Sequence, residues 1–279
     1  MVLSAFAFSL MTVFVKLAGR RLPWQEIVVA RAAVTFVLSY AWLRAARIPP
    51  FGQHRALLIV RGMFGFFGLS SVYYAVTHLP LAEATVIQYL YPPLTATLAA
   101  LLLRERLERS VFVSMALGLI GLLLVAQPAA LFGGIAAQLD PGGLFAAFLG
   151  AFFSACAYVT VRTLGQGEHP LVIVFYFPLV ALPASVVTMG THALWPEGIE
   201  WAWLLLLGLA TQVGQVAVTR GFASAAAGRM AAYSYVQVLF SAVWGVLLFE
   251  EHPTPLTLAG ALLIITGALV NARPSARKT

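Results

Sequence analysis

The chain repeats itself, without a gap, at an offset of 146 residues. Residues 74–128 align with residues 220–274, and the same offset places Lys16 over Arg162 and Gly19 over Gly165. The identical pairs in the aligned stretches are few: Tyr89/Tyr235, Ala96/Ala242, Leu101/Leu247, Leu102/Leu248, Glu105/Glu251, Gly121/Gly267 and Pro128/Pro274. Because the same offset aligns both the beginning and the end of the first half with the second, the sequence predicts a fold built from two similar halves.

The composition requires lipid as the solvent of these halves. Hydrophobic residues make up 61% of the 279 residues and charged residues only 10%, with a mean hydropathy of +0.91. A soluble domain has about 45–50% apolar and about 25% charged residues. A chain of this length cannot hide so much apolar surface from water, so an integral membrane protein is predicted. Its single cysteine, Cys156, can form no intramolecular disulfide.

Ten apolar stretches are long enough to be membrane-spanning helices, since a bilayer core of about 30 Å takes about 20 residues per helix. Divided by proline, glycine and charged residues, they lie at residues 2–18, 25–46, 56–77, 81–103, 110–126, 142–164, 170–190, 200–220, 225–249 and 254–271. The predicted fold class is all-α, with two five-helix repeats at residues 1–128 and 142–274. Residues 129–141 form the loop between the repeats, and residues 275–279 form a cytoplasmic tail.

The basic residues predict how the helices are oriented. If both termini are cytoplasmic, the inner segments hold twelve Arg and Lys residues, whereas the outer loops hold Lys16, Arg20 and Arg21. This distribution satisfies the positive-inside rule for a multi-pass protein of the inner (cytoplasmic) membrane. It also explains the net charge of +7, so no nucleic acid partner is expected. Because five is an odd number, the two repeats insert in opposite directions and form an inverted repeat.

The first helix is the shortest of the ten. Its repeat mate begins near Gly142, and the 146-residue offset places that residue four positions before Met1. The sequence therefore indicates that a few native residues precede Met1. A cleaved signal peptide is the alternative interpretation of residues 2–18. It is disfavoured because the segment lacks a basic n-region and an A-x-A site.

A set of short motifs resembles the drug/metabolite transporter superfamily in its ten-helix EamA-domain form. The motifs are Tyr74-Ala75, a small-residue turn at 79–83, Pro92, an L-x-E turn at 103–105, Gly118, Gly121 and Arg31. The resemblance covers the whole chain and implies a transporter. The aromatic-rich third and fourth helices look like those of YddG-type exporters of aromatic amino acids and metabolites. The second half departs from the pattern, because Val238 stands where Pro92 is in the first half.

Polar side chains inside the fourth and ninth helices indicate a substrate cavity. Gln88, Tyr91 and Thr95 share one helix face, and their repeat mates Ser234, Gln237 and Ser241 share another. Polar groups inside a membrane face the bundle interior or a water-filled cavity. Transporter sites lie where the repeats meet, so one central cavity is predicted. The alternative is that these stripes join helices by hydrogen bonds worth about 0.6 kcal/mol each.

Three further residues are predicted to join the cavity. They are Tyr74 and His78 on the third helix and Tyr158 on the sixth, and His78 is equally compatible with a purely structural hydrogen bond. The candidate substrate-binding residues are therefore Tyr74, His78, Gln88, Tyr91, Tyr158, Ser234 and Gln237. Aromatic rings there stack on an aromatic substrate while hydroxyls and amides bind its polar end.

Two features of the spans bear on mechanism. Pro92 and Pro93 are predicted to kink or unwind the fourth helix, as a gate, a hinge or a static kink. Arg31 and Arg61, the cations placed inside spans, are favoured as structural or paired residues over ligands of a substrate carboxylate. Every carboxylate lies at the end of a span or in a loop, so proton or sodium coupling is not expected.

The sequence therefore favours a secondary transporter over other classes. It carries no Walker loop, zinc motif or nucleophile elbow, so no ATP-driven pump, enzyme, cofactor or metal is expected. The leading hypothesis is export of small organic solutes, above all aromatic amino acids and related metabolites, by alternating access. An importer or exchanger of sugars or nucleotide sugars is the first alternative, and a polytopic membrane enzyme is the second. The expected partners are the small-molecule substrate and the lipid bilayer, with the protein a monomer or an oligomer of unknown size.

Overall fold

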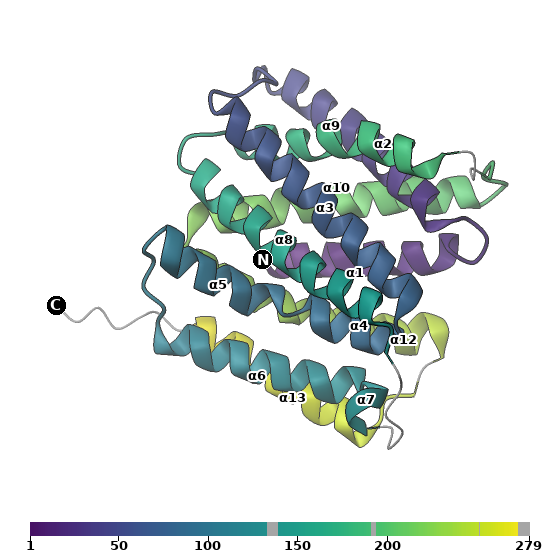
Figure 1. Cartoon of the computed structure of the whole chain (residues 1–279), viewed down its shortest axis with the longest axis vertical. Coiled ribbons are helices and arrows are strands. Elements are labelled where there is room, and N and C mark those ends of the chain that lie inside the picture. The colour runs from purple at the N-terminus through teal and green to yellow at the C-terminus, as the bar shows by residue number, and fades with distance from the viewer. Residues whose placement is uncertain (133–138, 191–193, 251, 273–279) are drawn as a thin grey trace. The chain divides into compact units, whose positions relative to one another are not determined.

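The computed structural model describes residues 1–132, 139–190, 194–250 and 252–272, and every regular element in these residues is a helix (Figure 1). In chain order the helices are α1 (Val2–Ala18), α2 (Trp24–Ala45), α3 (Arg55–His78), α4 (Leu81–Gln88), α5 (Tyr91–Leu102), α6 (Arg109–Ala126), α7 (Ala129–Phe132), α8 (Pro141–Leu164), α9 (Pro170–Met189), α10 (Glu200–Ser224), α11 (Ala227–Ala232), the 3-10 turn η1 (Tyr233–Tyr235), α12 (Val236–Phe249) and α13 (Pro255–Ala272).

The prediction of ten apolar spans is confirmed. Nine spans are at least 18 residues long, and the shorter α1 supplies the tenth among the described residues. Eight of the ten are single helices whose ends lie within four residues of the predicted ones. The other two, 81–103 and 225–249, are each broken into two helices. Residues 133–138 of the predicted inter-repeat loop and all of the predicted tail (275–279) lie outside the described residues.

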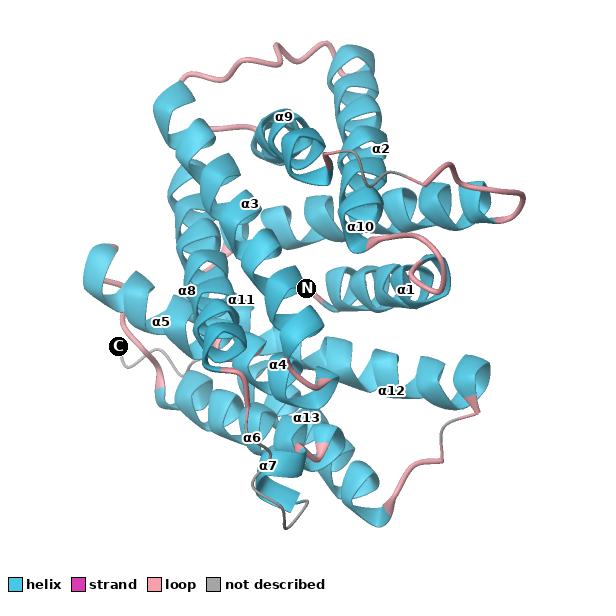
Figure 2. Cartoon of the chain, turned by 45° about the vertical axis from the view of Figure 1, so that its right-hand side comes forward, coloured by secondary structure: helices cyan, strands magenta, loops and turns pink. Residues whose placement is uncertain are grey.

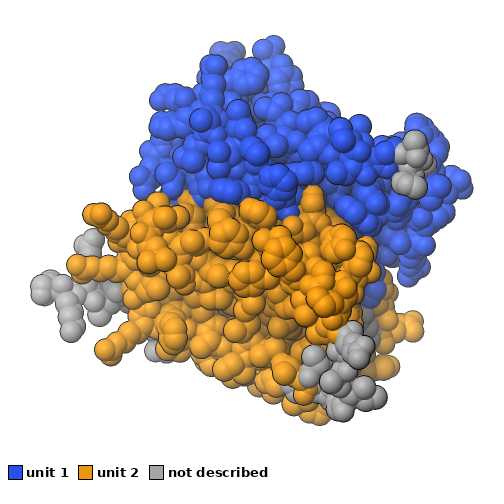
Figure 3. Space-filling view, in the orientation of Figure 1, with its two compact units in different colours: residues 1, 3–67, 160–224 blue, residues 2, 68–159, 225–279 orange. Residues whose placement is uncertain are grey.

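The chain forms two compact units, each assembled from both predicted repeats (Figure 3). Unit 1 contains residues 1, 3–67 and 160–224, and unit 2 contains residues 2, 68–159 and 225–279. The units therefore do not coincide with the repeats at 1–128 and 142–274, which stay a prediction. The helices α3 and α8 each contribute one part to either unit.

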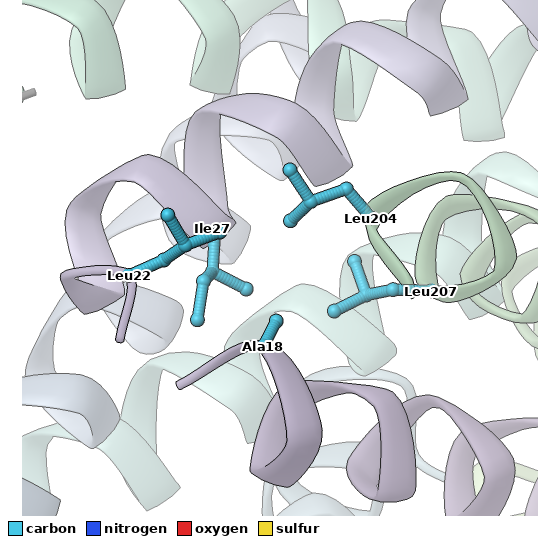
Figure 4. Packing of buried hydrophobic residues seen from close by; sticks show 5 residues of the cluster. All are labelled: Ala18, Leu22, Ile27, Leu204 and Leu207. Atoms are coloured by element: carbon cyan, nitrogen blue, oxygen red, sulfur yellow. The ribbon is translucent and has the colours of Figure 1, made fainter. Parts of the chain in front are cut away.

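One core of unit 1 forms where α1, the turn after it, α2 and α10 meet. It consists of Ala18, Leu22, Ile27, Leu204 and Leu207, each at most 3% exposed (Figure 4). These side chains carry no polar atoms, so their burial requires no hydrogen-bond partners. Their packing fixes the beginning of α2 against the first turns of α10.

An ion pair lies beside this core. The Arg21 guanidinium donates to both carboxylate oxygens of Glu200, at 2.8 and 2.6 Å, and to the Trp195 carbonyl at 2.8 Å. Glu197 lies 3.3 Å from the same guanidinium. The hydrogen bond to Glu200 raises the pKa of Arg21 further above its ordinary value, so this group stays charged at every working pH. The α1–α2 turn is thereby attached to the start of α10.

Two close helix contacts in unit 1 are copies of one another under the 146-residue shift. Gly62 of α3 lies against Val180 of α9, and Gly208 of α10 lies against Val34 of α2. A β-carbon at Gly62 would lie 3.0 Å from the Tyr176 carbonyl oxygen, so only glycine lets these helices approach so closely. Since 62 and 208 are repeat mates, as are 34 and 180, the sequence repeat reappears as a repeat of packing.

The helices α6 and α13 run side by side in unit 2 (Figures 1 and 2). A β-carbon at Gly121 would lie 2.6 Å from the Gly260 carbonyl oxygen, and one at Gly267 would lie 3.0 Å from the Ser114 carbonyl oxygen. These two contacts also exchange under the 146-residue shift. The fifth helix of one predicted half therefore packs on the fifth helix of the other through matched glycines.

Candidate functional site

The predicted effect of Pro92 and Pro93 takes the form of a complete break. The helix α4 ends at Gln88 and α5 begins at Tyr91, with a turn at Tyr89–Leu90 between them. The prolines lie in the first turn of α5, where a helix tolerates residues without an N–H. In a continuous helix the carbonyls of Gln88 and Tyr89 would accept hydrogen bonds from residues 92 and 93. Proline removes both donors, so these carbonyls need other partners.

The second half breaks at the equivalent place without proline. Between α11 and α12 the chain forms the 3-10 turn η1, Tyr233–Tyr235, and Val238 follows in α12 where the first half has Pro92. A 3-10 segment between two α-helical segments commonly marks a functional hinge. Under the 146-residue shift the two interruptions therefore meet at one pair of repeat mates, Tyr89 and Tyr235.

The two breaks contact each other inside unit 2. The Tyr235 hydroxyl donates to the Tyr89 carbonyl at 3.1 Å, which supplies the donor that Pro93 lacks. The two rings stack with their centroids 5.8 Å apart and an interplanar angle of 28°. Gly118 of α6 makes room for the Tyr235 ring, since a β-carbon at that position would overlap it. Tyr235 itself is 1% exposed, so this contact lies deep in the unit.

Three of the predicted substrate-binding residues meet beside these breaks. The Tyr91 and Tyr158 rings lie 5.4 Å apart, and Ser234 lies beside the Tyr91 hydroxyl. The Tyr89 ring lies 6.0 Å from that of Tyr91. Tyr91 and Ser234 are buried, whereas Tyr158 is half-buried. Together Tyr89, Tyr91, Tyr158 and Tyr235 form what we call the tyrosine cluster.

Gln88, the last residue of α4, is a polar neighbour of this region. Its Nε2 donates to the Ser154 hydroxyl of α8 at 3.3 Å. Its Oε1 is buried and has no hydrogen-bond partner among the residues that the structure describes. Leaving a buried acceptor unpaired costs about 1–3 kcal/mol. A ligand that donates a hydrogen bond to this oxygen would recover that free energy.

The structure places the other predicted site residues, Gln237, Tyr74 and His78, at the start of α12 and at the end of α3. Gln237, on the first turn of α12, is half-buried. Tyr74 and His78 stack on each other at 3.9 Å and are exposed on α3, where the His78 ring also contacts the Tyr74 carbonyl and the Thr77 hydroxyl. The ring contact and these hydrogen bonds are thus local to the end of α3, which lies close to Gly142 and Gly143 of α8. Whether any of the seven residues binds substrate stays a prediction.

Unit 1 contains a second polar group, built around the ring of Phe177. The guanidinium carbons of Arg61 and Arg31 lie 5.1 and 5.7 Å from its centroid, and both arginines are buried. Arg61 also donates to Gln215 Oε1 at 3.3 Å. Cation–π contacts of this kind stabilise a desolvated guanidinium by about 2 kcal/mol. They agree with the prediction of paired, structural arginines.

Sequence reasoning did not single out Ser154, and it named Tyr89 and Tyr235 as an identical pair of the repeat but not among the candidate substrate-binding residues. The signals were present: Ser154 lies four residues before Tyr158 on the same helix face, and Tyr89 and Tyr235 are identical repeat mates. No cluster of three or more His, Cys, Asp or Glu side chains that could hold a metal ion occurs in the described part of the chain.

In the described residues, nine apolar spans of membrane length and the shorter α1, with two spans interrupted beside a buried polar cluster, define a polytopic membrane protein with the architecture of a transporter. The EamA-like transporter family model matches residues 1–127 and 141–273. The chain belongs to this family, which confirms the resemblance to the drug/metabolite transporter superfamily. It is a membrane transporter, and the bilayer and a small-molecule substrate are its partners.

Individual relatives agree with the family. The pseudopaline exporter CntI of Pseudomonas aeruginosa is 34% identical over 273 residues, covering 98% of this chain and 94% of that protein. Solute carrier family 35 member G1 of Homo sapiens is 27% identical over 281 residues, covering 94% of this chain and 75% of that protein. A crystal structure of a protein that is 21% identical matches with a TM-score of 0.82 over 97% of this chain and 96% of its own, which shows the same fold.

Proposed function

We propose that this protein exports small organic solutes, most readily aromatic amino acids and related metabolites, by alternating access and without ATP. The buried amide oxygen of Gln88 beside the tyrosine cluster carries the proposal. The direction is supported by similarity to a relative named as an exporter. Both termini are proposed to be cytoplasmic, on the distribution of basic residues.

The chemistry of the cluster suits a solute with a planar ring and an ammonium group. An ammonium has three donors and no acceptor, so it complements an acceptor such as Gln88 Oε1. Tyrosine rings offer flat apolar faces to the aromatic part of a solute, in offset-stacked or edge-to-face geometry. The Ser234 and Tyr91 hydroxyls, which lie beside each other, are able to donate hydrogen bonds to the polar end of the solute.

Transport in reconstituted liposomes tests the proposal. Labelled phenylalanine, tyrosine and tryptophan are compared with alanine, glutamate and a labelled nucleotide sugar, with the solute loaded inside or outside. The aromatic amino acids should cross fastest, down their own gradient and without nucleotide. A panel in which none of the amino acids crosses faster than protein-free liposomes would refute the substrate class.

Two conservative variants test the site. Gln88→Leu keeps the volume but removes the amide, and Tyr91→Phe keeps the ring but removes the hydroxyl. The free energy of about 1–3 kcal/mol for a lost buried hydrogen bond predicts that transport at low solute concentration falls about tenfold for Gln88→Leu. The matched controls are Gln166→Leu and Tyr40→Phe, both at exposed positions of unit 1. Equal rates in all four variants would remove the site from the proposal.

Exchange of nucleotide sugars is the second candidate, and one observation favours it. Arg31 and Arg61, both in the first predicted repeat, are buried beside the ring of Phe177, so unit 1 holds two desolvated positive charges. Guanidinium groups are well suited to bind phosphate. In the same assay, preferred uptake of the nucleotide sugar, lost in Arg61→Gln but kept in Gln88→Leu, would establish this candidate in place of the first.

A further inference from the structure

Two membrane-facing grooves of unit 2 are copies of one another under the sequence repeat. The smaller groove, about 310 Å³, lies between α5 and α6, and the larger, about 700 Å³, lies between α12 and α13 and extends to α4 and α6. Eight of the nine residues that line the smaller groove fall on residues of the larger one when shifted by 146, Ala116 being the exception. Pro93, Leu107 and Val111 thus correspond to Leu239, Pro253 and Thr257.

The smaller groove is apolar and open toward the bilayer. Its lining is aliphatic and aromatic except for Thr97, whose hydroxyl bonds the Pro93 carbonyl of its own helix. Phe112 on its rim is 71% exposed, and Leu101 and Leu102 on the adjoining end of α5 are 72% and 68% exposed. Large apolar side chains so exposed in membrane-spanning helices face lipid tails. An acyl chain is therefore the natural occupant of this groove.

The mouths of the two grooves differ in charge. The turn between α5 and α6 carries Arg104, Arg106 and Arg109, all exposed. The same turn carries two acids, but Glu105 accepts a hydrogen bond from the Ala227 backbone N–H at 2.7 Å, and Glu108 accepts one from the Ser110 hydroxyl at 3.3 Å. Three arginines against two acids leave the turn with a net positive charge, and the arginines are the exposed groups while both acids accept hydrogen bonds within the protein.

The corresponding turn in the second half has no such charge. Under the shift, the three arginines become Glu250, His252 and Pro255. At the start of the two turns, Arg104 and Glu250 both adopt a left-handed conformation with φ of 56°. Of these two grooves, the α5–α6 groove is therefore the one that combines an apolar lining with a positively charged mouth.

We propose that the α5–α6 groove binds an anionic glycerophospholipid. One acyl chain lies in the groove between Pro93 and Leu119, and the phosphate is held by Arg104, Arg106 and Arg109. Basic pockets between membrane helices on the cytoplasmic side recognise anionic headgroups. The positive-inside prediction places this turn on that side. The α12–α13 groove takes up acyl chains without selecting the headgroup.

Lipid titration of the purified full chain tests this inference independently of transport. The detergent-solubilised protein is titrated with phosphatidylglycerol or phosphatidylcholine of the same acyl composition, and bound lipid is counted by native mass spectrometry. Phosphatidylglycerol should bind at least tenfold more tightly. Replacing all three arginines by glutamine should abolish this preference, because each cationic side chain near a headgroup contributes about 1 kcal/mol.

Two matched controls make the result specific. Arg44, Arg47 and Arg55 of unit 1 are equally exposed, so replacing these three by glutamine makes the same change in charge elsewhere. Ala116→Trp fills the α5–α6 groove, whereas Ala261→Trp fills the α12–α13 groove. The proposal expects loss of phosphatidylglycerol preference in Ala116→Trp only. Equal loss in the unit 1 triple variant, unchanged preference in Ala116→Trp, or equal binding of the two lipids to the wild type would each overturn it.

Discussion

Tyr235→Phe is expected to destabilise the protein, because it removes the side-chain donor to a carbonyl group at the break between α4 and α5. The Tyr235 hydroxyl is the donor to the Tyr89 carbonyl, which receives no backbone hydrogen bond from residue 93 because that residue is proline. Phenylalanine keeps the ring and hence its stacking on Tyr89. The substitution therefore removes one hydrogen bond and leaves one buried carbonyl oxygen without a donor.

The expected loss follows from the burial of this contact. Tyr235 is 1% exposed, so water cannot replace the hydroxyl. A buried acceptor left unpaired costs about 1–3 kcal/mol, and we expect the free energy of unfolding to fall by about 2 kcal/mol. The measurement is equilibrium unfolding in mixed micelles of a mild detergent and dodecyl sulfate, followed by circular dichroism.

A double-mutant cycle with Pro93→Ala tests the reason for the loss. Alanine at position 93 restores a backbone N–H that is able to donate to the Tyr89 carbonyl. The cost of Tyr235→Phe should then fall by about 1 kcal/mol or more, since coupled groups show interaction energies of about 0.5–3 kcal/mol. The same cost of Tyr235→Phe in both backgrounds would refute the idea that the hydroxyl substitutes for the missing proline donor. A Tyr233→Phe variant, on the same turn, is the matched control.

Two further results are expected. Gly121→Ala should lower the free energy of unfolding by about 1 kcal/mol. A β-carbon at this position would lie 2.6 Å from the Gly260 carbonyl oxygen, and overpacking α6 against α13 costs about 1–3 kcal/mol, partly offset by the higher helix propensity of alanine. Ala259→Val on the exposed face of α13 is the control, and a stability equal to that control would contradict the packing argument. An imposed pH gradient should not drive uphill accumulation of solute in liposomes, because carboxylates such as Glu83 lie in the first turn of a span rather than at mid-membrane. Accumulation that disappears in Glu83→Gln would show that transport is coupled to protons.

Much of the fold could be predicted because a bilayer leaves the backbone few choices. Apolar runs of about 20 residues must be helical there, and proline, glycine and charged residues mark their ends. The break after Gln88 was foreseeable from Pro92 and Pro93, although the sequence suggested a kink rather than two helices. The break at Tyr233–Tyr235 was not foreseeable, because Val238 gives no local signal. That break accompanies tertiary packing, in which Tyr235 fits against Gly118 and bonds Tyr89.

Sequence spacing nominated part of the candidate site, although the break after Gln88 divides the single helix face that it assumed. Spacing along α4 and α5 identified Gln88 and Tyr91, and the repeat added Ser234. Spacing cannot say which neighbour each side chain meets across helices, so the bond from Gln88 to Ser154 was not anticipated. The local stack of Tyr74 on His78 depends on side-chain rotamers at a helix end, which periodicity does not encode.

The contact between Tyr89 and Tyr235 has a consequence for how the two halves are able to diverge. A residue that packs against its own counterpart cannot be changed in one half without altering the environment of the same position in the other, as at a two-fold axis of a homodimer. Positions away from that contact carry no such restriction: Gln88 corresponds to Ser234 and Tyr91 to Gln237. The chain therefore keeps a pair of identical tyrosines at this contact and surrounds it with unlike groups, so that a symmetric frame carries an asymmetric set of side chains.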